Sequence, residues 1–334
     1  MKISEFSYKL PKELIAQYPA KERDKCRLMV MDRAMRTIEH KAFGDIVGYF
    51  KAGDCLVLNN TKVIPARLFA KRKTGGKVEI FLLEKKDPVS EALLRPSVRV
   101  KEGEKVVLES GDEVEVLGRS EIGRFVKFSR PLDRILGEAG HIPLPPYIAR
   151  RDEVRDRGDY QTVYGVKEGA TASPTAGLHF TNNLLEKIRA KGVKIAYVTL
   201  HTNYGTFAPV KCDDIEDHKM HKEYFELPQE TADIVRQTKE RGSAVFAAGT
   251  TANRVLEHCG ADLKASSGWT SLFIYPGYKF KVVDHLITNF HLPCSTLFIL
   301  ASAFAGKEFI MDAYRKAIEE KYRFFSYGDA TLIL

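Results

Sequence analysis

The chain is poor in cysteine, and the cysteines it has are scattered. Five occur among 334 residues, and no two of them form a CxxC pair. Zinc knuckles and dithiol redox centres use such pairs, so the sequence shows neither kind of site. An odd, dispersed set of thiols is typical of proteins in a reducing cytosol. We therefore expect a cytoplasmic protein.

Long apolar runs are also missing. The most apolar stretch, residues 297–305, is roughly half as long as a helix that spans a bilayer. Lys2 and Glu5 stand where a signal peptide would have its apolar core. Both absences argue against a membrane role.

Several common ligand-binding motifs do not occur. There is no GxxxxGK[ST] loop, which excludes the usual nucleotide-binding P-loop. His218 and His221 are three residues apart, but a pair at this spacing is weak without a third ligand. We therefore predict no metal site.

The composition is that of a folded protein that attracts polyanions. Apolar residues make up 44% of the chain and charged residues 29%, and the formal net charge is +8. The length favours about two domains. A basic surface is typical of proteins that bind nucleic acid, although many basic proteins bind none.

The pattern of residues changes along the chain. Short apolar runs separated by glycine and charged residues fill residues 66–130, which favours a small antiparallel barrel or sandwich with a tight turn at Gly75 and Gly76. After about Pro145, strands alternate with helices, which predicts an α/β domain with a mixed sheet. We expect residues 70–150 to be an inserted barrel domain and residues 1–69 and 151–334 to form the α/β domain.

The α/β pattern predicts individual elements. The expected helix over residues 181–191 has Thr181 as its N-cap and Gly192 as its stop. Expected strands cover residues 27–31, 55–58, 193–201, 243–249 and 330–334. Further helices are expected over residues 42–50, 228–241, from 251 onward, 295–304 and 307–322.

Residues 173–180 (SPTAGLHF) are the first candidate for chemistry. Pro174 and Gly177 form a turn before the helix, whose free N–H groups and dipole favour an anion. Thr175 adds a hydroxyl, and His179 adds a group that transfers protons near neutral pH. An ordinary capped helix with a hydrogen-bonded histidine explains the segment equally well.

Two further segments follow expected strands, where ligands bind in open α/β sheets. Residues 199–207 contain His201, although a lone histidine is more often a packed residue. Residues 249–257 place Thr250 and Thr251 at a helix start, where they could hold a carboxylate or phosphate. Arg254 and Glu257 in this segment could simply pair on the helix surface.

Two more segments suit nucleic acid. Residues 275–281 interleave aromatics with lysines, which stack on bases and neutralise phosphates, and the segment continues to Asp284, His285, Asn289, Phe290, His291 and Pro293. A loop with core aromatics is the commoner case. Residues 62–77 hold six cations and no acid, which favours a phosphate contact or a lysine-protected strand edge.

Together, these segments resemble one family over essentially the whole chain. The motifs that carry the resemblance are residues 59–68 (NNTKVIPARL), 143–148 (PLPPYI), 160–164 (YQTVY), 173–180, 216–221 (EDHKMH), 249–251 (GTT), 288–293 (TNFHLP) and 322–330 (YRFFSYGDA). They are similar to the S-adenosylmethionine:tRNA ribosyltransferase-isomerases of queuosine biosynthesis. The chain departs from the family pattern at Thr202-Asn203-Tyr204 and at Ala252-Asn253, while His201, Thr206 and Arg254 keep to it.

The resemblance implies an activity. The ribosyl part of S-adenosylmethionine would be transferred to 7-aminomethyl-7-deazaguanine at the wobble position of tRNA and isomerised. Epoxyqueuosine, adenine and methionine would be the products. The family resemblance also implies a β-barrel inserted in an α/β domain and no metal, and we expect a monomer without membrane contact.

Candidate roles follow from this reaction. Proton transfers are assigned to His179 and His201, with Asp284 and Glu257 behind them. Residues expected to bind the cosubstrate S-adenosylmethionine are Thr175, Gly177, Thr250, Thr251, Arg254, Tyr278, Phe280 and Tyr327. Two rival functions are a methyltransferase, disfavoured because no clear GxGxG loop follows the first strand, and a non-catalytic RNA-binding protein.

Overall fold

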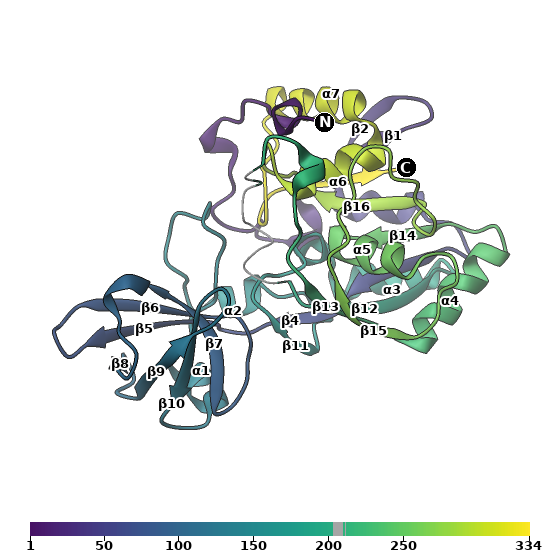
Figure 1. The fold of residues 1–334 in the computed structure, drawn as a ribbon. Coiled ribbons are helices and arrows are strands. Elements are labelled where there is room, and N and C mark those ends of the chain that lie inside the picture. Colours follow the sequence, from purple (N-terminus) through teal and green to yellow (C-terminus); the bar gives the residue numbers. More distant parts are fainter. Residues whose placement is uncertain (203–209, 211) are drawn as a thin grey trace.

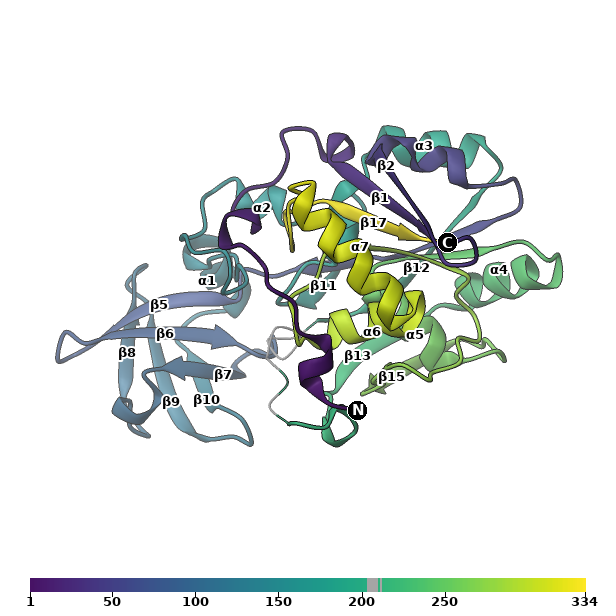
Figure 2. The same ribbon diagram turned by 90° about the horizontal axis from the view of Figure 1, so that it is seen from above.

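The structure, a computed structural model, describes residues 1–202, 210 and 212–334. A large body built on one sheet lies beside a smaller barrel, and the barrel stands to the same side of the sheet in both views (Figures 1 and 2). The predicted fold class, a mixed-sheet α/β domain with an antiparallel barrel, is confirmed. In the described part of the chain, no helix is long and apolar enough to cross a membrane.

The large body contains a nine-stranded mixed sheet with the order β15-β13-β12-β3-β14-β16-β17-β1-β2. Its central strands β12, β3, β14 and β16 run parallel to one another. The strands are β1 (Arg27–Asp32), β2 (Thr37–Ala42), β3 (Cys55–Asn59), β12 (Lys194–Leu200), β13 (Glu223–Leu227), β14 (Val245–Ala248), β15 (Ser266–Thr270), β16 (His285–Asn289) and β17 (Ala330–Ile333).

Helices cover both faces of this sheet, so its central strands are apolar throughout. In β3, Cys55 and Val57 belong to one hydrophobic cluster and Leu56 and Leu58 to the cluster on the other face, as the alternation of side chains along a strand requires. The first face carries α4 (Gln229–Glu240), α5 (Thr250–Cys259), α6 (Thr296–Ala305) and α7 (Lys307–Glu319), and the second carries α3 (Asn182–Ala190) (Figure 2).

The predicted helices are confirmed, except that one of them is a 3-10 helix rather than an α-helix. The Thr181 hydroxyl accepts a hydrogen bond from the backbone N–H of Leu184, which caps α3, and Gly192 follows the helix with φ of 85°. Residues 42–50 form a 3-10 helix, Phe43–Tyr49, rather than an α-helix. Several edge strands of the sheet were not predicted, because strands such as β2 are largely exposed and lack a buried apolar run.

The smaller body is a closed barrel of six strands with its own hydrophobic core. Gly75 has φ of 84° in the tight turn between its first two strands, as predicted. The sequence pattern missed β7 and β9. The barrel elements are β5 (Arg67–Arg72), β6 (Lys77–Leu82), β7 (Val89–Arg95), β8 (Lys105–Leu108), β9 (Glu113–Arg119), β10 (Arg124–Phe128) and the short helix α1 (Leu132–Ala139).

The chain leaves the sheet for the barrel at the carboxyl end of β3. Next come β4 (Thr61–Val63), which pairs with β11 (Lys167–Ala170) on the return path, and then β5. The barrel therefore stands at the edge of the sheet where β12, β14 and β16 also end. We propose that residues 70–150 form an inserted domain, with β5 beginning just before it.

Candidate active site at the carboxyl edge of the sheet

An open pocket of about 1000 Å³ lies at the edge where the parallel strands end. Loops that follow β11, β14 and β16 supply most of its walls, as expected for an open α/β sheet. Among the described residues, its lining contains hydroxyls, one amide, one imidazole and apolar groups but no Asp, Glu, Lys or Arg. Such a lining suits a ligand that carries its own charges and needs few counterions.

The N-terminus of α5 forms one wall of the pocket. Gly249, with φ of 93°, turns the chain from β14 into the helix, and its N–H donates to the carbonyl of Ile287 at 2.7 Å. No side chain caps this helix. Thr250 and Thr251 follow directly and line the pocket. The positive end of the helix dipole thus meets the cavity, which favours an anion there.

Two hydroxyls beside this helix end have no partner. The Oγ1 of Thr251 and the Oγ of Ser173 are buried and make no hydrogen bond within the described part of the chain. Both residues line the pocket and are less than a tenth exposed. Unsatisfied buried polar groups are rare in native proteins, and a ligand that bonds them removes the cost.

A chain of hydrogen bonds runs from the pocket wall into the core. The Thr175 hydroxyl donates to Oδ1 of Asn289 at 3.0 Å, and the Asn289 Nδ2 lies 3.1 Å from Nε2 of His179. That amide also donates to the carbonyl of Phe325 at 3.1 Å, which fixes its orientation. Nδ1 of His179 lies 3.0 Å from the sulfur of Cys26.

These contacts make His179 a supporting residue. Since an amide N–H can only donate, Nε2 of His179 accepts and the ring is neutral, with the proton on Nδ1. Burial lowers the pKa of His179 to about 3. The ring does not line the large pocket but a smaller one of about 440 Å³ behind it, together with Cys26. His179 therefore positions Asn289, and through it Thr175.

His291 is the imidazole that does line the large pocket. Its Nε2 lies 3.0 Å from the hydroxyl of Thr288, and Tyr314 contacts both its backbone N–H and its Nδ1. Burial lowers the pKa of His291 to about 3. The ring is therefore neutral near pH 7.

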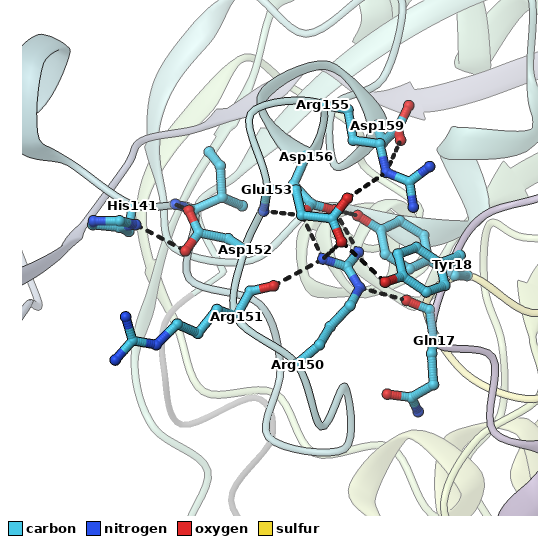
Figure 3. A network of polar contacts seen from close by, with 12 residues as sticks. Gln17, Tyr18, His141, Arg150, Arg151, Asp152, Glu153, Arg155, Asp156 and Asp159 are labelled. Carbon is cyan, nitrogen blue, oxygen red and sulfur yellow. Dashed lines mark hydrogen bonds and ion pairs between the residues drawn. The ribbon is translucent and has the colours of Figure 1, made fainter.

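Tyr147 and Ser326 close the side of the pocket next to the connector, residues 140–166, which returns from the barrel to β11. The Tyr147 hydroxyl lies 2.6 Å from the Ser326 Oγ, and Gln17 donates to the backbone carbonyl of Tyr147 at 3.0 Å. Figure 3 shows how the connector is held: Arg150 reaches from it to Gln17 and to both oxygens of Asp156. The pocket wall is thus fixed by the segment that returns from the barrel.

The predicted residues differ in their position relative to the pocket. Thr175, Thr250 and Thr251 line the pocket as the sequence suggested. His179 lies directly behind it. Gly177 also lies behind it, where a β-carbon would stand 2.1 Å from the Tyr164 hydroxyl oxygen, so this position needs glycine for packing.

Arg254 and Glu257, both on α5, are engaged in buried structural contacts instead. Arg254 forms an ion pair with Glu223 and donates to the carbonyl of Leu272 at 3.1 Å. Glu257 accepts from the backbone N–H groups of residues 281–283 and from the Tyr278 hydroxyl. Neither residue lines the pocket, because the helix directs both away from its N-terminus.

The remaining predicted residues lie elsewhere. Asp284 stands at the opposite, amino end of β14 and β16 and pairs with Lys239 at 2.7 Å. Tyr278 packs against Phe280, with ring centroids 5.1 Å apart, and the buried Tyr327 donates to Asp156 at 2.8 Å.

His201 lies beside the pocket but not in its lining. Its Nδ1 is 2.7 Å from the Thr61 hydroxyl, its ring stacks on Tyr224, and burial lowers its pKa. The neighbouring Thr202 does line the pocket. The expectations for Asn203, Tyr204 and Thr206 fall outside the described residues.

Sequence reasoning did not assign Asn289, His291, Tyr147, Ser295 and Ser326 to the site, although all line the pocket. A signal was present for the first two. They belong to the motif TNFHLP at the end of β16, the same position relative to a strand that singled out Thr250 and Thr251. The strand itself was not predicted, so this signal was missed.

Comparisons with known proteins place the chain in a family. A family model described as queuosine biosynthesis protein matches residues 3–333. The chain belongs to this family. An S-adenosylmethionine:tRNA ribosyltransferase-isomerase from a Sulfurihydrogenibium species is 55% identical over 337 residues, and one from Thermotoga maritima is 51% identical over 338, each with 100% of both chains covered.

A solved structure shows the same similarity. The crystal structure of an S-adenosylmethionine tRNA ribosyltransferase from Thermotoga maritima is 41% identical to this chain, with a TM-score of 0.58. The match covers 99% of this chain and 100% of the other. The match therefore spans both the sheet and the barrel.

Proposed function

We propose that the chain transfers the ribosyl part of S-adenosylmethionine to 7-aminomethyl-7-deazaguanine at the wobble position of tRNA and isomerises it to epoxyqueuosine. Adenine and methionine are released. The observation that carries this proposal is the full-length family match, in which curated relatives with the name S-adenosylmethionine:tRNA ribosyltransferase-isomerase reach 50–55% identity.

The pocket supports this proposal by its chemistry. S-adenosylmethionine carries a carboxylate, an ammonium and a sulfonium, so it supplies its own charges to a lining that offers hydroxyls and dipoles. The N-terminus of α5, with the free hydroxyls of Thr251 and Ser173, suits the methionine carboxylate. The Thr175 hydroxyl, held by Asn289, suits the ribose.

The reaction needs proton transfers at defined places. The sulfonium acidifies the C5′ hydrogens of the ribose, and a base that removes one of them permits loss of adenine. Adenine leaves more readily when protonated, and the attacking amine must be neutral. Of these three imidazoles, only that of His291 lines the pocket, so we assign it the proton transfers that the sequence had suggested for His179 and His201. His179 then serves as a positioning residue.

We propose that the partner is tRNA and that no step of the reaction uses a metal. No group of three His, Cys, Asp or Glu side chains suited to a metal occurs in residues 1–202, 210 and 212–334. We further propose that the enzyme acts as a monomer. We also propose that it acts in the cytoplasm, in keeping with its dispersed cysteines, all of which are free.

Analysis of the products tests the reaction. The protein is incubated with S-adenosylmethionine and tRNA that carries the aminomethyl-deazaguanine, and nucleosides and small molecules are identified by mass spectrometry. We expect adenine, methionine and epoxyqueuosine. Release of S-adenosylhomocysteine would indicate a methyltransferase instead, and tRNA binding without consumption of S-adenosylmethionine would indicate a binding protein.

A further inference from the structure

A group of arginines occupies one end of the barrel, away from the pocket residues. Arg119 ends β9 and Arg124 begins β10, and the two are direct cross-strand partners in this antiparallel pair. Arg95 ends β7, and Arg99 lies in the short 3-10 helix that follows it. Like charges directly opposite each other in a sheet are unfavourable, so folding alone does not explain this arrangement.

Three of these arginines make no ion pair in the described part of the chain, namely Arg99, Arg119 and Arg124. The guanidinium of Arg124 donates a hydrogen bond of 3.4 Å to the carbonyl of Ser97. Glu121 is the only acid within residues 93–99 and 119–124.

Three arginines elsewhere in the barrel are paired. Arg67 contacts Glu79 at 3.1 Å, Arg72 contacts Glu104 at 2.6 Å, and Arg130 contacts Glu138 at 2.6 Å. Arg67 and Arg72 belong to the basic segment 62–77, which the sequence had favoured for phosphate contact. Arg99, Arg119 and Arg124, which form no ion pair in the described part of the chain, therefore lie at the end of the barrel formed by β7, β9 and β10, outside the basic segment 62–77.

Exposed apolar side chains lie among these arginines. Val98 is 92% exposed, Ile122 57% and Phe125 43%. Val98 and Ile122 line one open hollow together with Arg95, Arg119 and Arg124. Exposed apolar side chains beside cations are typical of an interaction site, because neither the exposed apolar surface nor the cations stabilise the fold of the free protein.

The hollow lies next to a cleft between barrel and sheet. Arg95 also lines this cleft of about 580 Å³, whose other wall includes Pro143 and Thr171. Thr171 precedes Ala172 and Ser173, which line the candidate active site. The cleft thus shares Arg95 with the hollow, and its lining residue Thr171 is the sequence neighbour of a pocket residue.

We propose that this arginine face, made of Arg95, Arg99, Arg119 and Arg124, binds the sugar–phosphate backbone of the tRNA whose modified base enters the pocket. The inference rests on the proposed function. Guanidinium groups bind phosphates in bidentate fashion and stack on bases, and Phe125 offers a stacking surface. The net charge of +8 favours a polyanion over an acidic peptide or a second copy of this basic chain.

The test compares tRNA binding by the wild-type protein and the double variant Arg119→Ala/Arg124→Ala. We expect the dissociation constant for tRNA to rise at least about tenfold, and the slope of log K against log salt to shrink by about 1.4 to 1.8 because two phosphate contacts are lost. The KM for tRNA should rise by a similar factor, while kcat and the KM for S-adenosylmethionine stay near wild type. The unfolding temperature of this double variant should not be lower than that of the wild type, because the substitutions remove a repulsive pair.

The double variant Lys187→Ala/Arg189→Ala is the matched control. It removes the same charge from α3, which lies on the side of the molecule remote from the barrel in both views (Figures 1 and 2). We expect its tRNA affinity and salt slope to change little. An equal loss of affinity in both double variants would show an effect of net charge and overturn the proposal.

The outcomes separate this proposal from the proposed function. If the wild-type protein releases no adenine, the proposed function fails, while direct tRNA binding still tests the arginine face. If the wild type is active but Arg119→Ala/Arg124→Ala binds tRNA with unchanged affinity and salt slope, the arginine face is wrong and the function stands. A change of oligomeric state on gel filtration with unchanged tRNA binding would identify the face as a contact between copies.

Discussion

Thr251 and Thr231 carry similar side chains but serve different purposes. The Oγ1 of Thr251 is buried without a partner at the pocket, whereas the Thr231 hydroxyl donates to the carbonyl of Tyr197 at 2.6 Å and accepts from the N–H of the same residue. A hydroxyl without a bond costs stability in the free protein, and a hydroxyl with two bonds adds to it. The contrast agrees with the proposal that Thr251 binds a ligand, whereas Thr231 stabilises the fold.

Thr251→Val should weaken the binding of S-adenosylmethionine without destabilising the fold. We expect KM for S-adenosylmethionine to rise about tenfold, equivalent to one lost hydrogen bond of about 1.4 kcal/mol, with an unchanged or higher unfolding temperature. Thr231→Val should do the reverse, lowering the unfolding temperature with little effect on KM. Steady-state kinetics and thermal unfolding measure both. A Thr251→Val protein that is less stable but kinetically unchanged would contradict the assigned role.

The connector that returns from the barrel depends on one buried carboxylate. Asp156 is fully buried, binds Arg150 through two bonds of 2.7 and 2.8 Å, and accepts from the Tyr327 hydroxyl (Figure 3). Burial by itself would raise the pKa of Asp156, but these bonds lower it below its ordinary value. Since the same connector carries Tyr147, this contact also supports the pocket wall.

Asp156→Asn should therefore be strongly destabilising. The change keeps the shape but leaves the mostly buried guanidinium of Arg150 without its counterion, which costs about 3 kcal/mol of unfolding free energy. Asp312→Asn is the control, since its ion pair with Arg315 at 3.1 Å is exposed and should matter by less than about 0.5 kcal/mol. Urea unfolding measures both values, and equal effects would refute the importance of the connector.

The whole molecule should lose stability as the pH falls, partly through its buried histidines. His179 and His291 both have a folded-state pKa of about 3, against about 6.5 in an unfolded chain. Between these values, the unfolded state binds the proton and the folded state does not. The stabilising contribution of each ring is complete above about pH 6.5 and is lost progressively as the pH falls toward 3.

The expected slope is about 1.4 kcal/mol per pH unit for each of these histidines. Unfolding free energies measured from pH 7 to pH 4.5 should show this dependence, and His291→Gln should reduce the slope by about one proton. His221→Gln, which changes an exposed histidine, should leave the slope near that of the wild type. If the slope of His291→Gln equals that of the wild type, the buried neutral state of His291 is wrong.

The sequence by itself determined the fold class and indicated some residues of the candidate pocket. Strand periodicity, the Thr181 cap and the Gly75 turn depend on neighbours a few residues away, so they can be read without the fold. The rule that ligands bind beyond the carboxyl ends of strands indicated Thr250 and Thr251, and the turn before the helix at residue 181 indicated Thr175.

Only the tertiary structure decided which side chains face the pocket and which hold it together. His179 meets Asn289 across 110 residues of sequence, and Arg254 meets Glu223 across 31. Such partners depend on the order of strands in the sheet and on which side of a helix is buried, and neither is encoded in local spacing. For residues 173–180, local patterns left a capped helix and a site equally plausible, and the fold showed a wall whose histidine points inward and whose threonine points out.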